Sequence, residues 1–521
     1  MKTNKYILFA LTALFFVSCI EDESVGTINP ISDIVIDEGS LEKVYNIQKN
    51  ESLVIDPIVT QTDETMPLSY AWELDQEIIS TEKVFRYEGK RLGTYDGRLI
   101  VSNEDGKAFF TFTLNVNSPY EYGITVLSKD TEGRTHIAFM QEPMKEGDKK
   151  EFYDENCIEK NNPDRVFASN PADIIQTTGL LLLACQGQNG DNNDSPTIYF
   201  LNEKTFVVED YVKSEECIPA KLLTPPGNYS GVSYPVLSTD GKMYSLPTTT
   251  AVIQPHHKLT STYSPHLGFA VGTDTEFDII TWDNEVNGPA LIYNGYGPFY
   301  YGNKYLLVRD SLSKDDYFKK NFCDIDKEKK KKNKEVRALV PIHTSGKSRR
   351  EFIVISKANN GMLNKAVLAN FFWKDKDGTG RTYEIMDNGG FSGITDQPGY
   401  TGISVETPCI ANSTYQTLLF ANGNIVKKWN YASTEEKYFI NTKSENLLTV
   451  GSSSKAVITS FDISEDHKKT YVAFYEPNQE GKNGSVWVFD TDTGEVLEQY
   501  NNVCYQPVKM FYKKKAERKK K

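Results

Sequence analysis

The 521-residue chain lacks the short motifs that mark the common enzyme classes. It has no H-E-x-x-H zinc helix, no G-x-S-x-G nucleophile turn and no glycine-rich phosphate loop. The six histidines are scattered, and the one local group, His256 and His257 with His266, has no nearby cysteine or acidic ligand. Paired loop histidines of this kind are more often surface residues than metal ligands. A non-catalytic function is therefore favoured over an enzyme.

Positive charge is also scarce. The formal net charge is −13 at pH 7, whereas a protein that binds a phosphate backbone needs a basic surface. Nucleic acid is therefore not an expected partner. Lysine and arginine gather in two stretches, Lys327 to Lys334 and Lys513 to Lys521, and both are expected to be solvated runs. Residues 514–521 are interpreted as a basic tail.

Cysteines are few and widely spaced. Besides Cys19 there are six, and their separations exclude a zinc ribbon or a C-x-x-C redox site. Cys185 follows an apolar run and is expected to be a small buried hydrophobe. Disulfides are permitted outside the cytoplasm. Cys157 with Cys217 is the first pair to test, although spacing does not fix connectivity.

A long hydrophobic run is missing as well. The apolar stretch from Tyr6 to Val17 is too short to span a bilayer as a helix. Lys2 and Lys5 precede it and small residues follow it, which is the architecture of a secretory signal. Residues 1–18 are therefore predicted to be a signal peptide.

The end of this leader, Phe16-Val17-Ser18-Cys19, resembles a bacterial lipobox. The resemblance implies that Cys19 is acylated and becomes the mature amino terminus, and several acyl chains would hold the protein on a membrane. The alternative is a free cysteine near an ordinary cleavage site.

The acidic residues after Cys19 resemble the export signal of lipoproteins displayed on the outer face of some outer membranes. These residues are Glu21, Asp22 and Glu23. Residues 19–29 are therefore interpreted as a lipidated acidic tether in the outer membrane that faces the cell exterior. A plain solvated tether or a periplasm-facing anchor is the alternative.

What the chain has in quantity is strand formers. It contains 30 Tyr and 27 Phe, with recurrent Val, Ile and Thr and few helical periodicities, so a mostly β fold is expected. Residues 30–119 alternate apolar and polar side chains, as at Tyr70, Trp72 and Leu74 and again from Phe110 to Val116. Such alternation predicts a β-sandwich with one face of each sheet buried.

Within this first domain, Leu68-Ser69-Tyr70-Ala71-Trp72 and Gly93-Thr94-Tyr95 resemble the polycystic-kidney-disease (PKD) family of immunoglobulin-like domains. Leu74-Asp75-Gln76 stands where that family usually has Gly-Asp-Gly. The resemblance implies an N-terminal Ig-like, PKD-like β-sandwich.

Residues 122–513 have a different texture of short strands and polar turns. Ile198 to Val208 aligns without a gap on Val486 to Val496, and Leu237 to Tyr244 resembles Ile463 to Tyr471. Repeated hairpins of this kind predict a β-propeller of about six to seven blades. Stacked sandwich domains are the competing architecture.

Aromatic residues crowd one glycine-containing segment of the second domain. Exposed aromatic faces stack on sugar rings or receive peptide side chains, and packing in the blade core is the alternative interpretation. Two tryptophans have the same two interpretations. The candidate ligand-binding residues are Tyr293, Tyr296, Tyr300, Tyr301, Trp282 and Trp373.

The segment Asp375-Lys376-Asp377-Gly378-Thr379-Gly380 resembles the opening of a calcium loop, with oxygen ligands at Asp375, Asp377 and Thr379. Met386 stands where the closing acid should be. A metal-free polar hairpin loop is favoured, and no cofactor is required besides this candidate structural calcium and the lipid at Cys19.

A PKD-like module after a lipid anchor, followed by Tyr122-Gly123-Ile124-Thr125-Val126-Leu127-Ser128-Lys129-Asp130, resembles the PKD-like lipoprotein family. The resemblance implies an accessory surface lipoprotein of a starch-utilisation-type (SusCD-type) uptake system. Its partners would be a SusC-like TonB-dependent barrel and a SusD-like lid lipoprotein. Its ligand would be an oligopeptide or a glycan, bound for import without catalysis. The alternatives are a cell-surface propeller hydrolase, either glycosidase or peptidase, and a purely structural subunit of the transporter complex.

Overall fold

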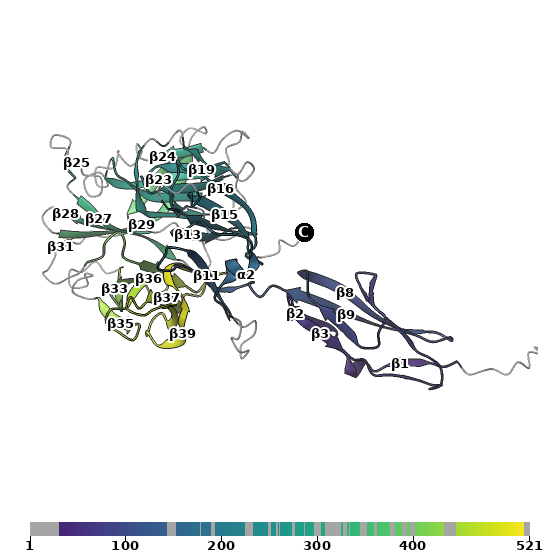
Figure 1. The fold of residues 1–521 in the computed structure, drawn as a ribbon. Helices are drawn as coiled ribbons and strands as arrows, with labels where there is room; N and C mark the ends of the chain where they lie inside the picture. Colours follow the sequence, from purple (N-terminus) through teal and green to yellow (C-terminus); the bar gives the residue numbers. More distant parts are fainter. Residues whose placement is uncertain are drawn as a thin grey trace, which may run out of the picture. The chain divides into compact units, whose positions relative to one another are not determined.

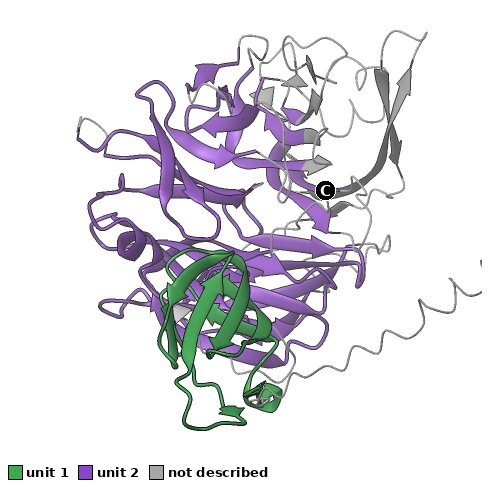
Figure 2. Ribbon diagram, turned by 90° about the vertical axis from the view of Figure 1, so that its right-hand side faces the viewer, with its two compact units in different colours: residues 1–117 green, residues 118–521 purple. Residues whose placement is uncertain are grey.

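The computed structural model divides the chain into two compact units, residues 1–117 and 118–521 (Figure 2). Each unit is considered by itself. The structure describes residues 31–142, 153–177, 179–188, 193–223, 233–247, 252–256, 259, 261–272, 277–285, 287–295, 304–307, 325–326, 331–332, 334–343, 352–358, 362–375, 381–387, 393–395, 402–431 and 444–514.

The first unit consists of three small sheets around one apolar core. Five strands pair in the order β2-β9-β8-β5-β6, and β1 pairs with β4 and β3 with β7. The strands are β1 (Ile34–Ile36), β2 (Val44–Gln48), β3 (Ser52–Ile55), β4 (Val59–Gln61), β5 (Ser69–Leu74), β6 (Glu77–Ser80), β7 (Phe85–Glu88), β8 (Gly93–Ser102) and β9 (Lys107–Asn117), with a 3-10 turn at Glu38–Ser40.

Trp72 is the centre of this core. It is fully buried and stacks on Phe85 of β7 with ring centroids 4.9 Å apart. Its indole Nε1 donates to the carbonyl of Glu82 at 3.0 Å, so the polar atom of the side chain is paired. Phe112 and Leu114 of β9 are buried on the same core, which confirms the predicted alternation of apolar and polar residues.

Among the described residues the second unit contains five four-stranded antiparallel sheets and one nine-stranded sheet, in which one parallel strand pair joins two antiparallel meanders. Counted by meander, the unit has seven. We number them sheets 1 to 7 in chain order (Figure 1). Sheet 1 contains β40 (Gln506–Lys513), β10 (Gly123–Lys129), β11 (Thr135–Gln141) and β12 (Tyr153–Asp154). Sheet 2 contains β13 (Pro171–Gln176), β14 (Leu180–Cys185), β15 (Thr197–Asn202) and β16 (Val208–Lys213). Sheet 3 contains β17 (Pro219–Leu222), β18 (Ser233–Ser238), β19 (Met243–Pro247) and β20 (Gln254–Pro255).

Four further meanders follow. Sheet 4 contains β21 (Tyr263–Gly272), β22 (Phe277–Asp283), β23 (Gly288–Gly295) and β24 (Lys304–Leu307). Sheet 5 contains β27 (Lys334–His343), β28 (Phe352–Ala358), β29 (Met362–Asp375) and β30 (Arg381–Asp387), with β31 (Gly393–Thr395) on β29. Sheet 6 contains β32 (Cys409–Asn412), β33 (Thr417–Asn422), β34 (Ile425–Asn430) and β35 (Glu445–Thr449). Sheet 7 contains β36 (Val457–Ile463), β37 (Lys469–Tyr475), β38 (Gly484–Asp490) and β39 (Val496–Cys504).

Two short elements lie outside the meanders. They are the helix α2 (Cys157–Asn161) and the hairpin formed by β25 (Ile325–Asp326) and β26 (Lys331–Lys332). β26 falls within the basic run that the sequence predicts to be solvated.

The first strands of the seven sheets form a closed ring. β40 contacts β13, and the contacts continue through β17, β21, β27, β32 and β36 back to β40. β27 and β32 even pair in parallel, with Ile342 opposite Ala411. The last strand of the chain therefore completes sheet 1, whose other three strands come from the start of the unit. The predicted mostly β, propeller-like fold is confirmed.

The order of strands in the sheets confirms one of the two predicted repeats and contradicts the other. The hairpins Ile198 to Val208 and Val486 to Val496 both join the third strand of a sheet to its fourth, so this repeat is confirmed. The second repeat is wrong, because Leu237 to Tyr244 joins the second and third strands of sheet 3 whereas Ile463 to Tyr471 joins the first and second strands of sheet 7. A Ser-x-Asp turn closes either hairpin equally well, since its serine hydroxyl bonds to the backbone of its own turn.

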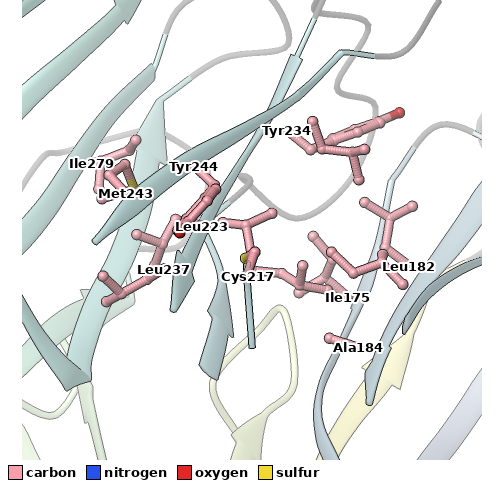
Figure 3. Packing of buried hydrophobic residues seen from close by; sticks show 14 of the residues in the cluster. Ile175, Leu182, Ala184, Cys217, Leu223, Tyr234, Leu237, Met243, Tyr244 and Ile279 are labelled. Atoms are coloured by element: carbon pink, nitrogen blue, oxygen red, sulfur yellow. The ribbon is translucent and has the colours of Figure 1, made fainter. Parts of the chain in front are cut away.

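Apolar clusters fill the spaces between neighbouring sheets. Figure 3 shows one of them, which contains Cys217 together with Ile175 and Leu182. Cys157 belongs to a different cluster, with Ile158 and Phe139. Both cysteines are free thiols, so a Cys157–Cys217 disulfide is wrong. Each thiol packs as a small apolar group in its own core.

Burial raises the pKa of the other described thiols, those of Cys185, Cys409 and Cys504. Cys185 is fully buried, as the sequence predicts, and burial raises its pKa to about 12. Cys409 and Cys504 are free as well. Buried thiols with raised pKa values are poor nucleophiles, because the thiolate is the reactive form.

Candidate ligand-binding surface at the ring closure

The structure places only some of the residues that the sequence singles out. Trp282 is 1% exposed and its Nε1 donates to Asn287 at 3.4 Å, so this side chain packs inside sheet 4 and offers no face to a ligand. Tyr293 lies on β23 and Trp373 on β29, but their side chains are outside the described residues. Tyr296, Tyr300 and Tyr301 are outside them entirely.

The side chains of the predicted ion site and of the lipid anchor also lie outside the described residues. Asp375 ends β29, and its side chain is outside the described residues together with Asp377, Thr379, Cys19 and the acidic tether. In the part of the chain that is described, no three His, Cys, Asp or Glu side chains gather in a way that could hold a metal ion. His256, expected at the surface, is buried at 7% exposure.

Among the described residues, tyrosine and glutamate side chains instead meet where the ring closes, between sheets 7 and 1. Strand pairing explains why. Tyr471 on β37 lies opposite Asp462 on β36, and Glu498 on β39 belongs to the same row through Val488. Directly opposite residues share a face of the sheet. Tyr500, two residues beyond Glu498, therefore points the same way.

Sheet 1 supplies the facing side chains. Tyr512 on β40 is paired with Ile124 on β10, which is in turn paired with Met140 on β11. Glu142 follows Met140 by two residues and shares its face because side chains alternate along a strand. Main-chain bonding fixes Tyr512 in place, since its N–H donates to Asp462 Oδ2 at 2.5 Å.

The phenols converge on the two glutamates. The Tyr512 hydroxyl donates to Glu142 Oε2 at 3.1 Å, and the Tyr471 hydroxyl approaches Oε1 of the same carboxylate at 3.5 Å. The two rings stack with centroids 5.6 Å apart. The Tyr500 hydroxyl donates to Glu498 Oε2 at 2.9 Å. We call these five residues, Tyr471, Tyr500, Tyr512, Glu142 and Glu498, the ring-closure cluster.

The electrostatics of the ring-closure cluster keep its phenols protonated. Burial is the main cause that raises the pKa of Tyr471, Tyr500 and Tyr512, and the neighbouring carboxylates add to it. A protonated phenol donates one hydrogen bond and still accepts others. Tyr471 is fully buried, while the other four side chains are half-buried and in contact with solvent.

This arrangement suits binding better than catalysis. Half-buried aromatic rings provide apolar faces, and carboxylate and phenol oxygens provide acceptors for hydroxyl or amide groups. The phenols are too weakly acidic to act as nucleophiles at neutral pH.

Sequence reasoning missed these five residues because none of them lies in a motif. Glu142 and Tyr512 are separated by most of the second unit and meet only because β40 pairs with β10. The available signal was the alternation of Met510 and Tyr512 in the last apolar strand, which marks it as a blade strand with one face toward a neighbour.

Comparisons with known proteins find similar solved structures but do not assign the chain to a family. No family model and no curated protein matches the chain. Among solved structures, a quinonprotein alcohol dehydrogenase-like protein from Bacteroides thetaiotaomicron VPI-5482 is similar over 92% of this chain and 99% of its own, with 13% identity and a TM-score of 0.42. Hydrazine synthase of Kuenenia stuttgartiensis is similar over 76% of this chain and 93% of its own, with 12% identity and a TM-score of 0.37. Likeness at this level decides neither fold nor function, so the architecture rests on the strand order.

A search of the described residues for membrane-crossing helices finds none with the length and apolarity required.

Proposed function

We propose that the protein is a lipid-anchored accessory subunit of a SusCD-type nutrient uptake system in the outer membrane. In this proposal a PKD-like, Ig-type module joins the Cys19 anchor to a seven-bladed propeller that binds oligosaccharide or oligopeptide without cleaving it. The leader, the cysteine at its end and the acidic tether support the location. The order of modules supports the association with a SusC-like barrel and a SusD-like lid.

The observation that carries ligand binding is the ring-closure cluster. Tyr500 and Tyr512 combine aromatic surface with fixed hydroxyls, and Glu142 and Glu498 supply acceptors beside them. This combination favours a glycan, because sugar rings present apolar faces for stacking and hydroxyls for hydrogen bonding. A hydrolase needs two carboxyl groups in distinct protonation states at a set separation. Here each glutamate accepts a hydrogen bond from a tyrosine.

Titration calorimetry with a panel of neutral oligosaccharides and oligopeptides tests the binding proposal. We expect Tyr500→Ala and Glu142→Gln each to weaken binding about tenfold, which corresponds to loss of one good polar or stacking contact. Tyr211→Ala is the matched control, because Tyr211 is 43% exposed on β16, away from sheets 1 and 7. Chromatography of the incubated ligands checks for cleavage, and the appearance of shortened products would support the hydrolase alternative.

The anchor and the partners need a separate experiment. Metabolic labelling with an alkyne fatty acid should mark the wild-type protein and leave Cys19→Ala unlabelled. Pull-down from native membranes should recover a TonB-dependent barrel with the wild type. Copurification of the barrel without any ligand binding in calorimetry would favour the structural-subunit alternative.

A further inference from the structure

Three consecutive first strands of the ring, β40, β13 and β17, bring two lysines and one aspartate together. Lys509 Nζ lies 2.5 Å from Asp173 Oδ1, and Asp173 is buried with 7% of its side chain exposed. Lys221 on β17 interacts electrostatically with both groups: Asp173 attracts its charge and Lys509 repels it. These three residues form a second polar site, separate from the ring-closure cluster.

Most acceptor positions of the carboxylate in this group are already occupied. Asp173 Oδ1 accepts the N–H of Ile174 at 2.9 Å in addition to Lys509, and Oδ2 accepts the N–H of Leu222 at 2.8 Å. A carboxylate has about four acceptor positions. Asp173 therefore has three of these positions occupied, and it bridges two strands while it pairs with one ammonium, that of Lys509.

Lys221 is the cation that remains. Among the described residues its Nζ donates to the carbonyl oxygen of Gly268 at 3.4 Å, which is a long contact for an ammonium with three donors. No carboxylate of the described residues lies within ion-pair distance of it. Burial, the main effect, and the repulsion from Lys509 lower its pKa. Both lysine side chains are half-buried, so solvent reaches them.

The site carries more positive than negative charge, whereas the chain as a whole is negatively charged. A protein of net charge −13 here places two ammonium groups against one occupied carboxylate. Asp462 lies across β40 from Asp173, and burial, the largest effect on it, raises its pKa. An incoming anion would offset the repulsion between the lysines and supply the missing acceptors of Lys221.

We propose that Lys221 and Lys509 form a binding site for a carboxylate group of the ligand. The inference rests on the proposed ligand-binding function and adds to it a preference for acidic ligands. The carboxylate has two sources of the same chemistry, a uronic acid in a glycan or the C-terminus of a peptide. The lysines recognise the negative charge in either case. The remaining atoms of the ligand determine whether the glycan or the peptide binds.

Titration calorimetry with two matched ligand pairs tests this site. Tri-galacturonate is compared with its methyl ester, and a tripeptide with its C-terminal amide. Each pair differs in charge while its size is nearly unchanged. We expect the wild type to bind one of the acids at least about tenfold more tightly than its neutral partner, because a charge-assisted contact is lost with the charge. The preference should shrink as salt is raised.

Variants assign the preference to the lysines. Lys221→Met keeps the apolar stem and removes the charge, and it should abolish the preference for the acid. Lys221→Arg keeps the charge and should retain it. Lys213→Met removes an exposed charge of β16 and should change nothing. Thermal unfolding of each variant confirms that it is folded.

Equal binding of acid and neutral ligand by the wild type would overturn the proposal, as would an unchanged preference in Lys221→Met. Absence of binding by both acids would overturn it too. Binding of neutral oligosaccharides through the ring-closure cluster would be unaffected by any of these outcomes, so the two proposals fail separately.

Discussion

Asp173 and Asp462 perform the same structural task at two places in the ring, but in different electrostatic surroundings. In each, Oδ1 accepts the N–H of the following isoleucine, and Oδ2 accepts an N–H from the first strand of the next sheet. Asp173 joins β13 to β17, and Asp462 joins β36 to β40. Each carboxylate therefore holds two neighbouring sheets together.

The difference lies in the counter-charge. Lys509 lies 2.5 Å from Asp173, while no lysine or arginine of the described residues lies within ion-pair distance of Asp462. Burial raises the pKa of Asp462, against the smaller opposing effects of its two N–H donors. The comparison shows that hydrogen bonding from the backbone sets the geometry of this bridge at both sites, while an ion pair with a lysine is present only at Asp173.

Removal of Asp173 should have the largest effect. Asp173→Ala leaves the N–H of Leu222 without this acceptor and Lys509 without its partner, so we expect a loss of about 3 kcal/mol. The measurement is the urea midpoint of the transition of the second unit, compared between wild type and variant at equal slope. Asp164→Ala, an exposed aspartate, is the control and should change stability by less than about 0.5 kcal/mol.

Asp462→Ala should come second. It removes the same two backbone acceptors but breaks no ion pair, so we expect a loss of about 2 kcal/mol in the same assay. If the two variants lost equal stability, the pairing with Lys509 would contribute nothing measurable. A larger loss at Asp462 would contradict the comparison.

The pH dependence of stability should separate the two sites further. The folded pKa of Asp462 is raised above its ordinary value of 3.8. The stabilisation linked to its proton is therefore fully present below 3.8 and is lost as pH rises through the folded pKa. Asp462→Asn carries no such proton, so the stability difference between wild type and variant should fall across this range. Urea titrations at a series of pH values measure it, and a difference that grows with pH would contradict the assigned direction.

Lys513 should show the opposite pH behaviour. Its Nζ donates to the carbonyls of Tyr120 and Glu121 at 2.7 and 2.8 Å, and burial lowers its pKa from 10.5 to about 8. Between pH 8 and 10.5 the unfolded chain binds more protons, so the wild type should gain stability relative to Lys513→Met as pH rises. The gain is at most about 1.4 kcal/mol per pH unit. A stability difference that stays flat across this range would show that Lys513 is charged when folded.

Local patterns in the sequence predict the sheets well and the sites poorly. The alternation around Trp72 and Leu74 correctly gives the buried face of β5, because a strand face is determined by its own residues. The hairpin at Val486 to Val496 is predicted for the same reason. Asp173 meets Leu222 and Lys509, however, only because three strands far apart in sequence are neighbours in the ring. The dipeptide Asp-Ile by itself does not predict that the aspartate will join two neighbouring sheets.

The smallest expected effects concern the phenols at the closing junction, beside Asp462. Tyr512→Phe removes the 3.1 Å hydrogen bond to Glu142, and Tyr471→Phe removes a contact of 3.5 Å to the same carboxylate. Because a hydrogen bond at 3.5 Å is weak, we expect about 1 kcal/mol of stability to be lost with Tyr512→Phe and less with Tyr471→Phe. Both variants keep the ring and therefore its stacking. Urea midpoints rank them, and calorimetry with a bound oligosaccharide should show weaker binding for Tyr512→Phe, because the Tyr512 side chain is only half-buried. An equal loss of binding in Tyr471→Phe, where the side chain is buried, would mean that the hydroxyls act through Glu142 and do not touch the ligand.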